Sequence, residues 1–254
     1  MDIVEFASLR DQANSLFSKH CHLTDDGADL NYRLYVPAEN PTGEKLPLVL
    51  FFHGAGERGT DNVSQLTHGV PSLLDYVLKF RGRAVILAPQ CPEEDLWADV
   101  VWGDPSHLMA ENPTASMGAV IELLSQIISD YSIDAERVYV TGVSMGGFAT
   151  WEILQRHPEL FAAAIPVCGG GDLTLVDRIV SVPLQVFHGG ADDVVWPIRS
   201  RAMVEALRGL GGAPGYTEYE GVGHDSWTET YANPSVLDWL FSQKREAGMT
   251  ELER

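Results

Sequence analysis

The segment that most constrains the fold is a serine flanked by glycines, Thr141-Gly142-Val143-Ser144-Met145-Gly146-Gly147. It follows the apolar run Arg137-Val138-Tyr139-Val140, which predicts a buried strand, and it precedes residues 148–154, which predict a helix. A Gly-x-Ser-x-Gly pattern between a strand and a helix predicts a turn so tight that side chains two positions before and after the serine would collide. The turn places Ser144 at the C-terminal edge of a sheet and points the N-terminus of the next helix at it.

Continuous apolar runs recur along the chain and predict the other strands of that sheet. They lie at residues 47–53, 84–89, 162–167 and 183–188, and helical patterns fall between them at about 63–80, 114–130, 146–156, 197–209 and 234–245. Continuous runs are typical of strands buried on both faces, as in a parallel sheet covered by helices. The alternation of strands and helices therefore predicts an α/β fold with a doubly wound, mostly parallel sheet.

The N-terminal region is more polar than the rest of the chain. Residues 1–28 predict a short helix and an edge strand, and residues 31–37 alternate and then stop at a proline, as an early exposed strand does. Neither a repeat nor a linker interrupts the 254 residues, so we expect a single domain over residues 1–254 with residues 1–28 as an N-terminal extension. We also expect a cytoplasmic protein, because the sequence shows neither a signal peptide nor a run of about 18 apolar residues.

Charge and cysteine content narrow the classes of partner. The formal net charge of −19 argues against binding to nucleic acid or to an anionic membrane and favours a neutral or cationic small molecule. The three cysteines, Cys21, Cys91 and Cys168, are odd in number and lack CxxC spacing, so no disulfide framework or metal cluster is predicted. The sequence contains no HExxH or GxxxxGK[ST] motif, and we expect neither a metal nor another cofactor.

A glycine-rich loop follows the predicted strand at 47–53 and has the sequence His53-Gly54-Ala55-Gly56-Glu57-Arg58-Gly59. Such a loop lets a backbone N–H group approach a ligand. Together with the N–H of the residue after the serine, it would form an oxyanion hole. We assign Met145 as the first donor and Ala55 as the second, with Gly56 as the alternative to Ala55. We interpret His53 as a structural residue that orients this loop.

Two later loops offer an acid and a base. Residues 188–197 follow a predicted strand, and the pattern His-Gly-x-x-Asp-x-x-Val within them selects Asp192 over Asp193, while the first histidine of the pattern is interpreted as structural. His224 stands in the glycine-bearing segment 220–227, which is able to swing it toward the serine. The chain order of serine, acid and histidine predicts a nucleophile, an orienting carboxylate at Asp192 and a general base at His224.

Two features bear on the substrate pocket. Only about fifteen residues separate Val167 from Pro183, which is too few for a large helical lid and predicts an open site. Residues 90–114 form the longest irregular stretch, and long loops at an active edge are often functional. Four tryptophans are candidates to line an apolar or aromatic acyl pocket, namely Trp97, Trp102, Trp196 and Trp227.

From about residue 30 onward, the chain resembles the α/β-hydrolase superfamily. Within it, four segments look like the esterases often labelled predicted peptidases or phospholipase/carboxylesterase-like proteins, which are akin to dienelactone hydrolases, feruloyl esterases and polyhydroxyalkanoate depolymerases. These segments are the loop 53–59 with Asp61-Asn62, the run Ala88-Pro89-Gln90-Cys91-Pro92, the Gly-x-Ser-Met-Gly-Gly turn and the Gly-His-Asp-x-Trp ending. The resemblance implies hydrolysis of carboxylic esters. Many secreted members carry a signal peptide, which this sequence does not show, so a polymer-degrading role is disfavoured.

We therefore expect a serine carboxylesterase that hydrolyses short-chain or aromatic esters through an acyl-enzyme on Ser144, with a small-molecule ester as its partner. One alternative uses the same serine, acid and histidine to hydrolyse an amide bond, which would make the protein a serine peptidase or amidase of small peptides. A second is a non-catalytic binding protein with the hydrolase fold, although such proteins usually lack a member of the triad. A third is an acyltransferase that passes the acyl group to an alcohol. The sequence makes no prediction of oligomeric state.

Overall fold

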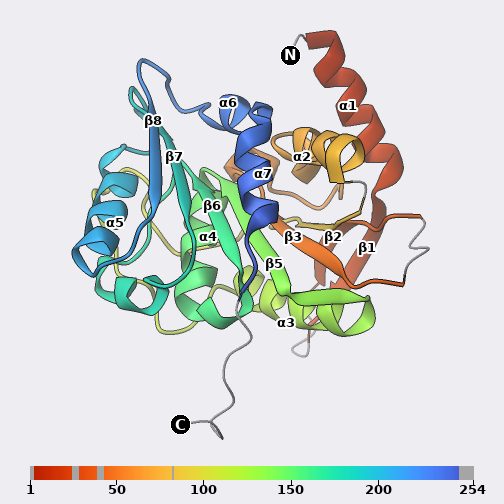
Figure 1. The fold of residues 1–254 in the computed structure, drawn as a ribbon, viewed down its shortest axis with the longest axis horizontal. Coiled ribbons are helices and arrows are strands. Elements are labelled where there is room, and N and C mark those ends of the chain that lie inside the picture. Colours follow the sequence, from red (N-terminus) through yellow and green to blue (C-terminus); the bar gives the residue numbers. More distant parts are fainter. Residues whose placement is uncertain (1–2, 25–28, 39–42, 82, 246–254) are drawn as a thin grey trace, which may run out of the picture.

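A computed structural model describes residues 3–24, 29–38, 43–81 and 83–245 of the chain. Eight strands form one sheet in the order β1-β2-β4-β3-β5-β6-β7-β8 (Figure 1). Their bounds are Ser18–Leu23 (β1), Asp29–Tyr35 (β2), Leu46–Phe52 (β3), Val85–Pro89 (β4), Ile133–Val143 (β5), Ala163–Val167 (β6), Gln185–Gly189 (β7) and Gly215–Tyr219 (β8). Strands β3 to β8 pair in parallel, whereas β2 runs antiparallel to β1 and to β4. The predicted mostly parallel sheet is confirmed.

Helices cover both faces of the sheet (Figure 1). Their bounds are Ile3–Leu16 (α1), Val70–Tyr76 (α2), Ala115–Asp130 (α3), Met145–Arg156 (α4), Ile198–Gly209 (α5), Trp227–Ala232 (α6) and Pro234–Ser242 (α7). Apolar residues of α3, α4 and α5 share one core with the sheet, and those of α2 and α7 share the core on the other side. This arrangement is the predicted doubly wound fold.

The central strand β3 explains why its sequence is apolar without alternation. Leu48, Leu50 and Phe52 belong to the core under α3 to α5, while Val49 and Phe51 belong to the core under α2 and α7. All five side chains are buried, and burying each one stabilises the fold by about 1.5–3 kcal/mol. A strand with a helix layer on either side therefore needs apolar residues at both parities.

The N-terminal segment joins the same sheet. Strand β1 pairs with β2 along its whole length, and α1 packs against α2. The prediction that residues 31–37 form an exposed strand is wrong, because β2 lies between β1 and β4 and is mostly buried. Arg33 of this strand is buried, and its guanidinium donates to the backbone carbonyls of Asn14 and Asn62.

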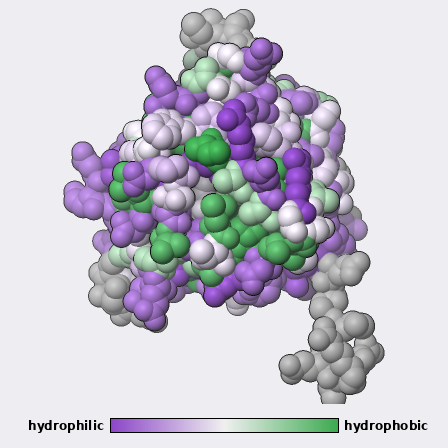
Figure 2. Space-filling view, turned by 90° about the vertical axis from the view of Figure 1, so that its left-hand side faces the viewer, coloured by the Kyte–Doolittle hydropathy of each residue, from purple (hydrophilic) through white to green (hydrophobic). Residues whose placement is uncertain are grey.

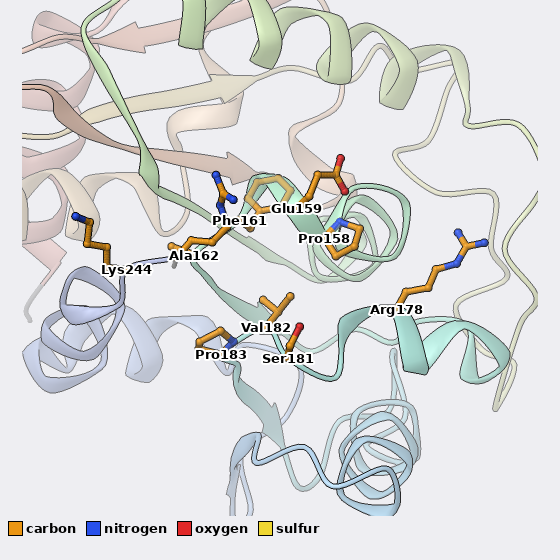
Figure 3. Close-up of a pocket in the computed structure, with 10 residues that line it drawn as sticks. Pro158, Glu159, Phe161, Ala162, Arg178, Ser181, Val182, Pro183 and Lys244 are labelled. Atoms are coloured by element: carbon orange, nitrogen blue, oxygen red, sulfur yellow. The ribbon is translucent and has the colours of Figure 1, made fainter. Parts of the chain in front are cut away.

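The parallel strands bring their C-terminal ends to one edge of the sheet, at the top of Figure 1, where the loop after β8 leads into α6. The loops after β3, β5, β7 and β8 meet there, and residues 90–114 contain no helix or strand. Only a 3₁₀ helix, Leu173–Ile179, forms in the segment before β7, so the site carries no large lid. A cavity of about 570 Å³ lies away from this edge, lined mainly by residues just before β6 and β7 (Figure 3). Among the described residues, no helix is long and apolar enough to cross a membrane.

Candidate active site

The turn after β5 has the strained geometry that its glycines predict. Ser144 adopts φ 55° and ψ −117°, a positive φ that non-glycine residues rarely take. A Cβ atom on Gly142 would lie 2.3 Å from the carbonyl oxygen of Gly146, and one on Gly146 would lie 2.1 Å from that of Phe52. Both contacts are far too short, so only glycine fits at either position. Strain of this kind costs about 1–3 kcal/mol and persists because the surrounding backbone fixes the turn.

The structure brings together the serine, acid and histidine selected from the sequence. His224 Nε2 lies 2.8 Å from Ser144 Oγ, and His224 Nδ1 lies 2.8 Å from Asp192 Oδ2. The carboxylate accepts a hydrogen bond from Nδ1–H, which leaves the Nε2 lone pair facing the serine hydroxyl. The side chain of Asp192 is fully buried, whereas that of His224 is 21% exposed and reachable from solvent. This arrangement can transfer the serine proton to the imidazole.

Asp192 is held by donors on both of its oxygens. Oδ1 accepts the backbone N–H groups of Val194 and Val195, each at 2.9 Å, and Oδ2 faces His224 and His188. Burial by itself would raise the pKa of this carboxyl. The hydrogen bonds from His188, His224 and Val195 outweigh burial and hold the pKa well below its usual range. Asp193, the competing acid in the sequence, is exposed to solvent.

The two predicted oxyanion donors are residues that begin a helix near the serine. Met145 is the first residue of α4, and Ala55 begins a short 3₁₀ helix directly after Gly54. Within the described part of the chain, neither of their N–H groups donates to a protein acceptor. A Cβ on Gly54 would lie 3.7 Å from the Cβ of Ser144, so the peptide that carries the Ala55 N–H borders the nucleophile. The alternative donor, Gly56, stands one residue further along, where a Cβ would meet no atom within 4 Å.

His53 fixes the loop that carries Ala55. Its Nε2 accepts the N–H of Cys91 at 2.9 Å, so the proton resides on Nδ1 and is donated to the carbonyl of Gly54 at 2.6 Å. Burial lowers the pKa of His53 to about 4, and the ring is therefore neutral. Arg58 ties the same loop to residues 93–95 through their backbone carbonyls. These contacts agree with the structural role expected for His53.

The four tryptophans have different environments. Trp97 is fully buried and donates its Nε1–H to the carbonyl of His53 at 3.2 Å, so its assignment to an open pocket is wrong. The ring fills the space beneath the glycine-rich loop instead. Trp102 and Trp227 are half-buried, and Trp196 is 47% exposed. Pocket roles for these three stay predictions.

Glu57 and His68 extend the site beyond the residues found in the sequence. The Glu57 carboxylate is almost buried, and burial raises its pKa, partly offset by the neighbouring His68. His68 Nε2 lies 3.6 Å from Glu57 Oε1, and its ring lies 5.5 Å from that of Trp227. Trp227 in turn meets His224 edge-on at 5.3 Å. Glu57 was detectable because it stands in the glycine-rich loop, whereas His68 reaches the site from the turn before α2 and left no signal.

Cys168 also lies at the site, although the sequence indicated no role for it there. It follows β6 at the active edge, and its Sγ accepts the backbone N–H of Ser144 at 3.3 Å. Potential metal-ligating atoms of Cys168, Asp192 and His224 lie within 4.8 Å of one another. Burial raises the pKa of the thiol far above its usual range, so it stays protonated and is a poor metal ligand. The carboxylate and imidazole are also already engaged with each other.

Comparisons with known proteins agree with this geometry. Residues 30–213 match the model of the family described as esterase PHB depolymerase. The chain is 30% identical over 141 residues to a poly(3-hydroxybutyrate) depolymerase of Ralstonia pickettii, covering 54% of this chain and 28% of that protein. It is 24% identical over 215 residues to feruloyl esterase B of Neurospora crassa, covering 70% and 68% respectively. The chain thus spans less than a third of the depolymerase and about two thirds of the feruloyl esterase.

Solved structures of similar fold include a thermostable esterase with a TM-score of 0.83 and 39% identity. That match covers 92% of this chain and 64% of the other. A ferulic acid esterase at 18% identity has a TM-score of 0.66, with coverage of 89% and 97%, and shares the fold. The strands and helices described above are therefore an arrangement found in esterases.

Proposed function

The chain belongs to the esterase PHB depolymerase family, and on that premise we propose that it is a serine carboxylesterase acting on short-chain or aromatic carboxylic esters through an acyl-enzyme on Ser144. The observation that carries the proposal is the continuous hydrogen-bonded chain from Ser144 through His224 to Asp192, with both contacts at 2.8 Å. A non-catalytic binding protein would have no need for this alignment.

In the first half of the reaction, Ser144 Oγ attacks the ester carbonyl carbon while His224 Nε2 takes the hydroxyl proton. Asp192 keeps the imidazole in the tautomer that can accept this proton and stabilises the imidazolium that forms. The negative charge on the tetrahedral intermediate develops beside the N–H groups of Met145 and Ala55. Each such donor contributes about 2.7–4 kcal/mol to stabilising that charge.

The intermediate collapses when the carbon–oxygen bond to the alcohol breaks and His224 gives its proton to the departing oxygen. The acyl group then remains on Ser144. A water molecule, deprotonated by His224, attacks the acyl carbon and releases the carboxylic acid, which restores the serine hydroxyl. Every proton in the cycle moves through His224, so the mechanism uses only residues of this chain.

Apolar surface near the acid loop supports short or aromatic acyl groups. Val194, Trp196 and Ile198 are large hydrophobic residues exposed at or just before the start of α5. Figure 2 views the molecule from the side of Figure 1 on which α5 lies and shows hydrophobic residues gathered within a hydrophilic surround. The relatives include a feruloyl esterase and acetylxylan esterases, whose names specify an aromatic and a short acyl group. The strongly negative chain favours uncharged esters.

A panel of p-nitrophenyl esters from acetate to palmitate, together with methyl ferulate, tests this proposal on the full chain and on Ser144→Ala. We expect turnover of the short and aromatic esters and its loss in the variant. Thermal unfolding of both proteins checks that the variant remains folded. Failure of the folded wild-type protein to hydrolyse any ester would refute the proposal. Turnover of matched p-nitroanilides above the esters would point to an amidase.

We further propose that the chain acts as one domain, which the single continuous sheet supports. The cytoplasmic location expected from the sequence stays a prediction. The relatives include a protein of Arthroderma benhamiae described as secreted, at 25% identity over 217 residues.

A further inference from the structure

A second histidine lies behind the acid, where the proposed mechanism gives it no step. His188 is the penultimate residue of β7 and is fully buried. Its Nε2 lies 2.8 Å from the carbonyl oxygen of Val195 and 3.3 Å from Asp192 Oδ2. Its Nδ1 lies 2.8 Å from the hydroxyl oxygen of Ser200 on α5. Both ring nitrogens therefore have polar neighbours.

The protons around this ring can be assigned from the chemistry of its neighbours. Nε2 faces a carbonyl and a carboxylate, which only accept hydrogen bonds, so Nε2 carries a proton. On the other side, Ser200 Oγ donates to the carbonyl of Gly169 at 2.9 Å and thereby uses its single proton. The hydroxyl can then only accept from His188, and Nδ1 must also carry a proton. All four polar contacts are satisfied together only when His188 is an imidazolium.

Burial of the neighbouring carboxylate points the same way. The side chains of His188 and Asp192 are both fully buried, and a buried charge is costly unless an opposite charge accompanies it. A neutral His188 would leave the negative charge of Asp192 to uncharged hydrogen-bond donors alone and would take the Ser200 hydroxyl away from Gly169. The imidazolium gives a neutral pair instead.

We propose that His188 is a protonated positioning residue that fixes Asp192 and neutralises its charge. The inference rests on the proposed function only in treating Asp192 as the acid of the triad. With its charge balanced by protonated His188, Asp192 still orients His224. It attracts an additional proton onto the His224 ring less strongly. His224 therefore remains an available base at lower pH than it would beside an uncompensated carboxylate.

The other groups that face His188 do not replace Asp192 as its counter-charge. Glu218 is its partner on β8, but that carboxylate is bound by Arg201 on α5 through contacts of 2.6 and 2.7 Å. The hydrogen bond from Arg201 lowers the pKa of Glu218 to about 2. Cys168, which directly follows β6, is protonated and neutral, and His224 contacts the same carboxylate oxygen of Asp192 as His188 does.

The protonation state can be measured directly by nitrogen-15 NMR of the histidine rings in the intact chain. His188 signals are assigned by their disappearance in His188→Gln. We expect both ring nitrogens of His188 to be protonated across neutral pH. A single protonated nitrogen would overturn the proposal. This readout needs no substrate, so its outcome is separate from the success or failure of the esterase assignment.

The pH dependence of kcat/KM tests the consequence for catalysis. His188→Gln keeps an N–H donor near Asp192 but removes the positive charge. We expect the acidic limb of its profile to move to higher pH by roughly one unit, with a lower kcat. His157→Gln, which alters a surface histidine, is the matched control and should leave the profile in place. An acidic limb that does not move in a folded His188→Gln variant contradicts the proposed charge.

Discussion

The loops after β3 and β8 both carry a histidine to the active edge, yet they hold it in opposite ways. His53 is buried, and each of its ring nitrogens is bound by backbone, the N–H of Cys91 and the carbonyl of Gly54. His224 is partly exposed, and its nitrogens face the side chains of Asp192 and Ser144. A ring saturated by backbone can only support a loop, whereas a ring between a carboxylate and a hydroxyl can move a proton. The role of a histidine is therefore decided by the groups that its ring nitrogens contact, more than by its sequence context.

The largest expected difference between the two loops is in catalysis. His224→Ala removes the base, and we expect kcat for p-nitrophenyl acetate to fall by roughly 10³–10⁶-fold with little change in thermal stability. Steady-state kinetics beside thermal unfolding provides the measurement. A variant that keeps more than a tenth of wild-type activity would remove His224 from the role of base.

His53, in the loop after β3, should instead affect the stability of the protein. Because burial lowers the pKa of His53 from 6.5 to about 4, the unfolded chain binds a proton at higher pH than the folded protein does. Neutral His53 therefore contributes to the free energy of unfolding in full above about pH 6.5. This contribution is lost as pH falls toward 4, and the loss amounts to at most roughly 3 kcal/mol. Urea unfolding between pH 7.5 and 4.5 measures it.

The control for that experiment is His53→Asn, because the pKa of His107 is also lowered to about 4 and contributes in the same direction. The difference between the two proteins isolates His53. Equal loss of stability on acidification in both proteins would show that His53 is not the group responsible.

A smaller effect is expected from Arg58, which ties the first loop to residues 93–95 and to the carbonyl of Ala55. Arg58→Ala should loosen the second oxyanion donor and lower kcat about 10-fold, less than complete loss of a donor would. KM should change little, because the guanidinium bonds to backbone. Saturation kinetics separates the two constants, and a rise in KM at constant kcat would instead assign Arg58 to substrate binding.

The smallest effect is expected next to the acid. Asp193 is exposed, so Asp193→Asn should change the free energy of unfolding by no more than about 0.5 kcal/mol and leave kcat unaltered. Asp192→Asn, the matched variant, should lower kcat by roughly 10⁴-fold because the imidazole loses its orienting carboxylate. Comparable losses in both variants would contradict the assignment of the acid.

Features that follow from steric limits on the backbone, or from burial of both faces of a strand, were predictable from the sequence. The glycines around Ser144 are required by collisions with atoms a few residues or one strand away, and the continuous run of β3 follows from two covered faces. The assignment of β2 as exposed failed because Arg33 is buried by partners distant in sequence. Alternation of polar and apolar residues along one segment does not show whether a further strand will pair with it and cover it.

The same limit applies within the active site. The acid was found because its loop follows a predicted strand, and the base because it stands in a glycine-bearing segment. The burial of Trp97, by contrast, depends on how residues 90–114 fold over the glycine-rich loop. His68 reaches the site through tertiary packing alone. The protonation of His188 depends on Ser200, twelve residues away on a helix. Spacing along the chain locates groups at the edge, whereas their orientation comes from packing.

Cys168 places an internal reporter against the nucleophile. Its thiol is fully buried and protonated, and it accepts a hydrogen bond from the N–H of Ser144, so an alkylating reagent can reach it only when the turn after β5 opens. The rate of alkylation of Cys168 thus measures how often the strained turn opens by local unfolding. A bound ligand that holds the turn closed would lower the rate of alkylation of Cys168. That rate would then report whether the active site is occupied without any substrate being turned over.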